Sequence, residues 1–138
     1  MMRLSKKVEY GLIALEYMSE KRYGELTTAR ELADKFNISL ELMMKILQSL
    51  VRSALIVSVQ GVRGGYYLEK STSDINMSEI IAAIDGPFRL VDCIKSSGPS
   101  KCGRDKYCHI RKPLENIQAK LEDFFNEISL KDFNEKFK

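Results

Sequence analysis

The sequence predicts a mostly α-helical protein that carries one small β-hairpin and ends in a long helix. Three observations predict this fold class. Apolar residues recur at helical spacing near both ends of the chain, two short helical segments meet at a tight turn in the first half, and a β-branched run with a glycine-rich turn follows them directly. A chain of 138 residues suits one domain with a modest core and an appended element.

The first half of the chain is predicted to form three helices. The first covers residues 2–20 and has its apolar residues at helical spacing, namely Leu4, Val8, Leu12, Leu15 and Met18. Thr28 and Glu31 form a capping box that starts the second helix, and Asn37, which tolerates the left-handed turn conformation, ends it. Ser39 caps the third, which reaches about Ser53. Two short helices joined by so tight a turn form a helix-turn-helix unit, a pattern common in DNA-binding proteins and also found in other helical proteins.

A β-hairpin is predicted directly after the third helix. Residues 55–59 and 66–68 form its strands, and the turn at residues 61–65 contains three glycines. Arg63 lies at the tip, between glycines that let the backbone approach a phosphate closely. The sequence therefore predicts a winged helix-turn-helix domain; the alternative is a hairpin that only covers the core.

The second half of the chain is predicted to contain two more helices around a loop. Asn76 and Glu79 cap the first, which Gly86 and Pro87 end. Pro113 suits the first turn of the last helix, whose apolar residues return at spacings of three and four: Leu114, Ile117, Leu121, Phe124 or Phe125, and Ile128. So narrow an apolar seam favours a homodimer over packing on the same domain. The predicted divisions are residues 1–86 for the winged domain, 87–111 for a cysteine-containing loop, and 112–138 for a dimerisation helix and tail.

Composition and charge exclude several classes of protein. The net charge is +3, and positive residues collect in residues 1–70, with 11 Lys and Arg against 8 Asp and Glu, and in residues 93–112, with 6 against 1. There is no apolar run of membrane-spanning length and no signal peptide, so we expect a cytoplasmic protein without a membrane partner. A single histidine, with no nucleophile–base pair and no phosphate-binding loop, argues against an enzyme.

The three cysteines, Cys93, Cys102 and Cys108, lie within sixteen residues of one another. An odd number of cysteines in a reducing compartment argues against a disulfide scaffold and favours a metal or redox site. Thiolates bind soft metals and iron–sulfur clusters, and the spacings here are wider than those of common zinc sites. The alternative is a set of reduced cysteines without a ligand.

Several segments together resemble the Rrf-two family of bacterial transcription regulators. These are the start at residues 2–5, the segment from Ile38 to Leu50, the wing at residues 61–66, and Ile84-Asp85-Gly86 followed by the cysteines. The resemblance covers essentially the whole chain. It implies a homodimer that binds double-stranded operator DNA, with recognition helices in the major groove and wings in the minor groove. Carried over by position, the expected DNA-contacting residues are Thr28, Ser39, Leu40, Met44, Lys45, Gln48 and Arg63.

The resemblance also implies a 2Fe–2S or 4Fe–4S cluster held by the three cysteines. In some members of the family the fourth ligand is a histidine three residues after the last cysteine, a position that is Arg111 here. Other members use a carboxylate from the first helix of the partner subunit, and the matching residue here is Glu9. Glu9 is therefore the expected fourth ligand, and His109, which directly follows Cys108, is the alternative.

The function expected from the sequence is that of a transcription repressor controlled by an iron–sulfur cluster. The cluster would sense nitric oxide, redox state or iron–sulfur supply. A cluster-free regulator of the same fold, controlled by thiol oxidation or by a protein partner as in cysteine-metabolism regulators, is the alternative.

Overall fold

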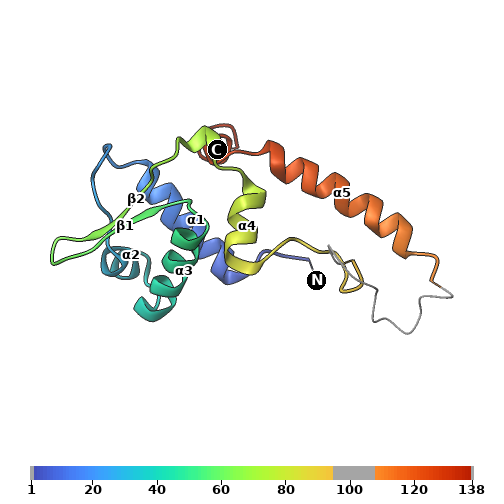
Figure 1. Ribbon diagram of the computed structural model, residues 1–138, viewed down its shortest axis with the longest axis horizontal. Coiled ribbons are helices and arrows are strands. Elements are labelled where there is room, and N and C mark those ends of the chain that lie inside the picture. The colour runs from blue at the N-terminus through green and yellow to red at the C-terminus, as the bar shows by residue number, and fades with distance from the viewer. Residues whose placement is uncertain (1, 95–107, 138) are drawn as a thin grey trace.

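The computed structural model describes residues 2–94 and 108–137 (Figure 1). Within them the elements are α1 (Lys6–Ser19), α2 (Ala29–Phe36), α3 (Leu40–Arg52), β1 (Val57–Val59), β2 (Gly65–Tyr67), the 3-10 turn η1 (Thr72–Asp74), α4 (Met77–Asp85), α5 (Arg111–Glu127) and α6 (Leu130–Glu135). The strands β1 and β2 pair antiparallel, with Val57 opposite Tyr67. The predicted fold class, mostly helical with one hairpin and a long C-terminal helix, is confirmed.

The predicted helix caps are present. Thr28 accepts a hydrogen bond from the Glu31 amide at 3.0 Å, and Asn76 accepts one from the Glu79 amide at 2.9 Å, each as part of a reciprocal capping box. Asn37 ends α2 with a left-handed backbone, φ 53°. Local side-chain chemistry therefore fixes where α2 and α4 begin and where α2 ends.

Apart from shifts of one residue, as in the second strand (Gly65–Tyr67 and not residues 66–68), two boundaries differ from the sequence prediction. The first helix begins at Lys6 and not at residue 2, because Ser5 accepts a hydrogen bond from the Val8 amide and caps the helix there. The first strand begins at Val57 and not at residue 55. Leu55 and Ile56, which belong to the predicted strand, are buried in the core ahead of it.

The core lies between α1, α3 and α4, and its largest fully buried side chains include Leu15, Met43, Leu47, Leu50 and Ile80. The C-terminal segment contributes to this core as well. The Leu130 amide donates to the Ile75 carbonyl at 2.8 Å, the Met77 amide donates to the Ile128 carbonyl at 2.8 Å, and the Leu130 side chain is only 1% exposed. The segment predicted as a tail thus includes a helix, α6, that packs on the winged domain.

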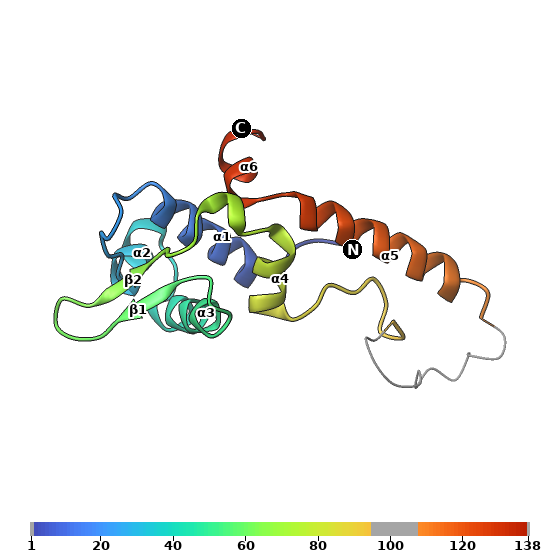
Figure 2. The ribbon, with the colours of Figure 1, turned by 45° about the horizontal axis from the view of Figure 1, so that its top comes forward.

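The long helix α5 projects from the rest of the molecule as an arm in both views (Figures 1 and 2). It packs on α4 and on the segment that follows α4, where the rings of Phe88 and Phe125 meet edge to face, 5.6 Å between centroids. Ile117 and Phe124, from the predicted seam, are 49% and 52% exposed. No helix in the described part of the chain is long and apolar enough to cross a membrane.

Candidate DNA interface and cysteine segment

The outer face of α3 carries the predicted DNA-contacting side chains. Ser39, which caps the helix, is exposed together with Met44, Lys45 and Gln48, and Leu40 is half-buried. The opposite face, with Met43, Ile46, Leu47 and Leu50, is buried in the core. The helix therefore presents a face of mixed polar and apolar side chains to solvent, while its buried face fixes its position in the core.

One charged pair modifies this face. Lys45 forms an exposed ion pair with Glu41, 3.6 Å from Nζ to Oε1. A surface pair of this kind contributes little to stability. The carboxylate of Glu41 also lowers the positive potential that Lys45 adds to this face of the helix.

Arg63 is exposed in the turn that joins β1 to β2. Gly61 has φ +116°, and a side chain at Gly64 would overlap the Val59 carbonyl, so the turn requires glycine at both positions. At its base, Tyr66 exchanges two backbone hydrogen bonds with Thr27, at 2.8 and 2.9 Å. The wing is thereby tied to the segment that leads into α2.

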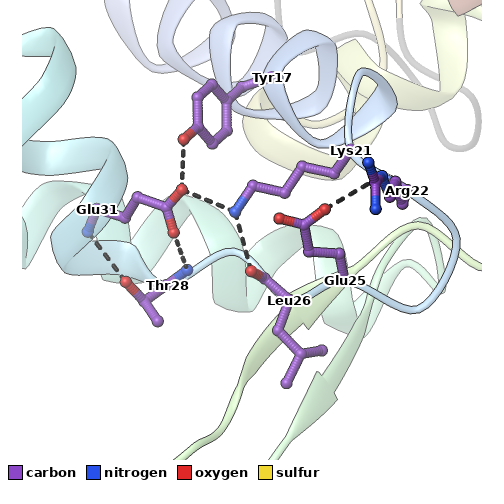
Figure 3. Close-up of polar contacts among 7 residues, drawn as sticks. All are labelled: Tyr17, Lys21, Arg22, Glu25, Leu26, Thr28 and Glu31. Carbon is purple, nitrogen blue, oxygen red and sulfur yellow. Dashed lines mark hydrogen bonds and ion pairs between the residues drawn. The ribbon is translucent and has the colours of Figure 1, made fainter.

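A cluster of polar contacts holds the start of α2 against the end of α1 (Figure 3). The carboxylate of Glu31 accepts hydrogen bonds from the hydroxyl of Tyr17 and from Nζ of Lys21, the latter at 2.7 Å. Lys21 also donates to the carbonyl of Leu26 at 2.9 Å. Because Glu31 closes the capping box as well, the exposed Thr28 is held in a fixed place at the N-terminus of α2.

These contacts shift two pKa values in opposite directions. Burial raises the pKa of Glu31, but the hydrogen bonds from Lys21, Tyr17 and the Thr28 backbone outweigh it and hold the pKa below its ordinary value. The hydrogen bond to Glu31, followed by burial, raises the pKa of Tyr17. Glu31 is therefore ionised and Tyr17 protonated at neutral pH, which is the state that the contacts require.

The structure describes two of the three cysteines. Cys93 follows α4 and Cys108 precedes α5; both are half-buried and neither is in a disulfide. Cys102 lies outside the described residues. Nowhere in residues 2–94 and 108–137 are three or more His, Cys, Asp or Glu side chains gathered closely enough to hold a metal ion.

The two candidates for the fourth ligand are placed differently. Glu9 lies in the first turn of α1 and pairs with Lys6 at 3.1 Å, with its side chain 45% exposed. The hydrogen bond from Lys6 to Glu9 raises the pKa of Lys6. His109 is exposed beside Cys108. Both side chains are thus accessible, and Glu9 would have to leave Lys6 to bind a metal.

Sequence reasoning missed Gln118, which is 8% exposed on α5. Its side chain accepts a hydrogen bond from the Leu90 amide at 3.0 Å and donates one to Glu122 at 3.2 Å. A signal was present in the sequence, since Gln118 follows Leu114 by four residues and so lies on the apolar face of the helix.

Comparison with known proteins gives a family match over nearly the whole chain. The family model Rrf2, described as an iron-dependent transcriptional regulator, matches residues 4–136. The transcriptional regulator NsrR of Bacillus licheniformis is 26% identical over 131 residues, which are 95% of this chain and 91% of that protein.

Solved structures share the fold. The global cysteine regulator CymR of B. subtilis superposes with a TM-score of 0.73 at 22% identity, covering 97% of each chain. IscR of T. potens superposes with a TM-score of 0.71 at 20% identity, covering 99% of this chain and 89% of that one. The fold is therefore shared over nearly the whole chain.

Proposed function

The chain belongs to the Rrf2 family of transcriptional regulators, and from this premise we propose that it is a repressor whose operator binding is controlled by an iron–sulfur cluster. Its relatives are transcriptional regulators and not enzymes. This agrees with the prediction from the sequence that the protein is not an enzyme. One observation carries the proposal. Two free, half-buried thiols stand at the two ends of the segment that joins the winged domain to α5.

The DNA contacts are proposed for the exposed face of α3 and the wing. Gln48 suits an adenine edge, Leu40 and Met44 suit thymine methyl groups, and Lys45 and Arg63 suit phosphates or the minor groove. Ser39 and Thr28 cap α3 and α2 and can donate their hydroxyl protons to phosphates, since each oxygen already accepts a backbone amide.

The cluster is proposed to be held by Cys93, Cys102 and Cys108, with Glu9 of the partner subunit as the fourth ligand. Thiolates are the ligands that iron–sulfur clusters use, so the donor set fits the group. When bound, the cluster would supply a centre that nitric oxide or oxidation alters. The accessible carboxylate of Glu9 is a weaker iron ligand than a thiolate. A weak ligand suits a sensor, because it can leave the iron when the signal molecule binds.

The dimer is proposed to form along α5. Ile117 and Phe124 are exposed apolar side chains on one helix, and Ile110 just ahead of it is 64% exposed. Exposing three large apolar side chains along α5 to water costs free energy. Pairing with α5 of a second copy would bury them.

The test is an anaerobic purification followed by absorption and Mössbauer spectra of the fresh protein. A brown protein with iron and sulfide bound, and operator binding that changes on cluster loss, supports the proposal. A colourless protein that still binds DNA favours the second candidate, a cluster-free regulator controlled by thiol oxidation or a protein partner. The observation that favours this candidate is that Cys93 and Cys108 are unpaired and therefore open to oxidation.

A further inference from the structure

Gln118 is a buried polar side chain on a helix that is otherwise largely exposed. Only 8% of it is accessible, and both ends of its amide are used. Oε1 accepts from the Leu90 backbone amide at 3.0 Å, and Nε2 donates to the Glu122 carboxylate at 3.2 Å. A buried side chain amide with both partners in place holds its neighbours firmly, because breaking either bond leaves a desolvated group unpaired.

The partners of Gln118 connect three segments. Leu90 belongs to the irregular segment after α4, and Glu122 belongs to α5. The hydroxyl of Ser78 on α4 donates to the Glu122 carbonyl at 3.5 Å. The edge-to-face contact of Phe88 with Phe125 holds the same segment on the same helix. The segment after α4 is therefore fixed to α5 at two successive points.

This anchored segment leads directly to Cys93. Leu90 lies three residues before it, and the Ile94 amide donates to the Val91 carbonyl at 3.3 Å, which closes a turn around the cysteine. At its other end the segment continues from α4, which packs on both α1 and α3. Cys93 is therefore connected through the Leu90–Gln118 bond to α5, and through α4 to α3.

We propose that Gln118 is a positioning residue that fixes the Cys93 turn on α5 and so couples the state of this thiol to the helix-turn-helix unit. The inference rests on the proposed function, because it assumes that the cysteine segment controls DNA binding. Glutamine is the side chain that fits the position. It accepts from Leu90 and donates to Glu122 at once, whereas a carboxylate at position 118 would face the carboxylate of Glu122.

The test compares four variants of the full-length protein with the wild type. Gln118→Leu removes both hydrogen bonds, and Gln118→Glu keeps the acceptor for Leu90 but creates repulsion with Glu122. The double variant Gln118→Glu with Glu122→Gln keeps the Leu90 bond and restores the bond between positions 118 and 122, with donor and acceptor exchanged in that bond. Asn116→Leu, at an exposed position of the same helix, is the matched control.

The first readout is the rate at which iodoacetamide alkylates Cys93 in the reduced, cluster-free protein, followed by peptide mass spectrometry. Gln118→Leu should raise this rate about five- to tenfold, as expected for the loss of one net hydrogen bond that anchors the turn to α5. Gln118→Glu should also raise it, because its repulsion with Glu122 weakens the same anchor. The double variant and Asn116→Leu should react like the wild type. The second readout is the ratio of operator affinities with and without the cluster, which should fall toward one in Gln118→Leu.

Equal Cys93 rates in all variants, or a double variant that reacts as fast as Gln118→Glu alone, would overturn the proposal. If Gln118→Leu does not fold, as judged by circular dichroism, the proposal is tested by comparing the alkylation rate of Gln118→Glu with that of the double variant. If the operator affinity of the wild-type protein changes neither on cluster loss nor on thiol alkylation, the proposed regulation of DNA binding is wrong. The alkylation rates still decide whether Gln118 positions Cys93.

Discussion

Lys21, just beyond the end of α1, forms a 2.7 Å ion pair with Glu31 in the first turn of α2 (Figure 3). The pair joins the two helices at the point where the helix-turn-helix unit begins. Glu31 also accepts from Tyr17 and closes the capping box with Thr28, so one carboxylate sets both the start and the orientation of α2.

Replacing Glu31 by Gln should lower the free energy of unfolding by about 1 kcal/mol at neutral pH, through loss of the charge-assisted bonds. The folded-state pKa of Glu31 lies below its ordinary value of 4.5. Its ionised form therefore stabilises the protein above that value, and the contribution is lost as the pH falls through the folded-state pKa. Between about pH 6 and about pH 3 the wild type should lose more stability than Glu31→Gln, as measured by urea unfolding. The exposed Glu69→Gln is the control, and parallel pH profiles for wild type and Glu31→Gln would contradict the assignment.

Lys45→Ala and Arg63→Ala should each weaken operator binding and reduce the slope of log affinity against log salt by about one charge. Fluorescence anisotropy over a salt series measures both effects. Lys131→Ala, an exposed lysine on α6, should change neither. Unchanged affinity in both variants would mean that DNA lies elsewhere on the molecule.

Glu41→Gln should act in the opposite direction. It removes the carboxylate that pairs with Lys45 at 3.6 Å and repels phosphates, so operator affinity at low salt should rise by about two- to tenfold. Fold stability should change by less than about 0.5 kcal/mol, because the pair is exposed. A drop in affinity for the operator with no drop for unrelated DNA would instead identify Glu41 as a base-reading residue.

Ile117→Glu together with Phe124→Glu should convert the proposed dimer into monomers and abolish operator binding. Both side chains are about half exposed in the protomer, so the fold itself should survive. Sedimentation velocity measures whether the protein is a dimer or a monomer, and circular dichroism checks that the variant is folded. Asn116→Glu, exposed on the same helix, should leave the dimer intact. A double variant that stays dimeric would place the interface elsewhere.

Changing Cys93, Cys102 or Cys108 to Ala should prevent stable cluster assembly, because a site with three thiolates has no spare ligand of that kind. Glu9→Ala should leave a cluster with an altered absorption spectrum and altered sensitivity to oxygen or nitric oxide. His109→Ala should have little effect, since two adjacent residues seldom reach the same metal. Iron and sulfide analysis with absorption spectra measures all five variants. The reverse pattern, an effect of His109→Ala and none of Glu9→Ala, would make the histidine the fourth ligand.

Leu130→Ala should destabilise the winged domain by about 2–5 kcal/mol, the usual cost of emptying a buried leucine site. Leu130 is 1% exposed although it lies on α6, near the C-terminus. Thermal unfolding monitored by circular dichroism measures the loss. The neighbouring exposed Lys131→Ala is the control. A change below about 0.5 kcal/mol would mean that α6 is not part of the core.

Local chemistry let the sequence alone determine most of the fold and the side of α3 that is exposed to solvent. The caps at Thr28, Ser39 and Asn76 and the left-handed turn at Asn37 depend on side chains within three or four residues, and each is present as predicted. The outer face of α3 followed from helical periodicity, because the inner face had to be the apolar one.

The tertiary structure decided what depends on residues far apart in the chain. Leu130 enters the core through backbone pairing with Ile75, and Gln118 holds Leu90 across 28 positions of sequence. The Lys21–Glu31 pair likewise forms only because the folded chain brings the end of α1 next to the first turn of α2. The periodicity of the sequence does not specify such contacts. They form when the whole chain folds and buries its apolar surface. Polar groups that lose contact with water must then form hydrogen bonds with partners that can lie far away in the sequence.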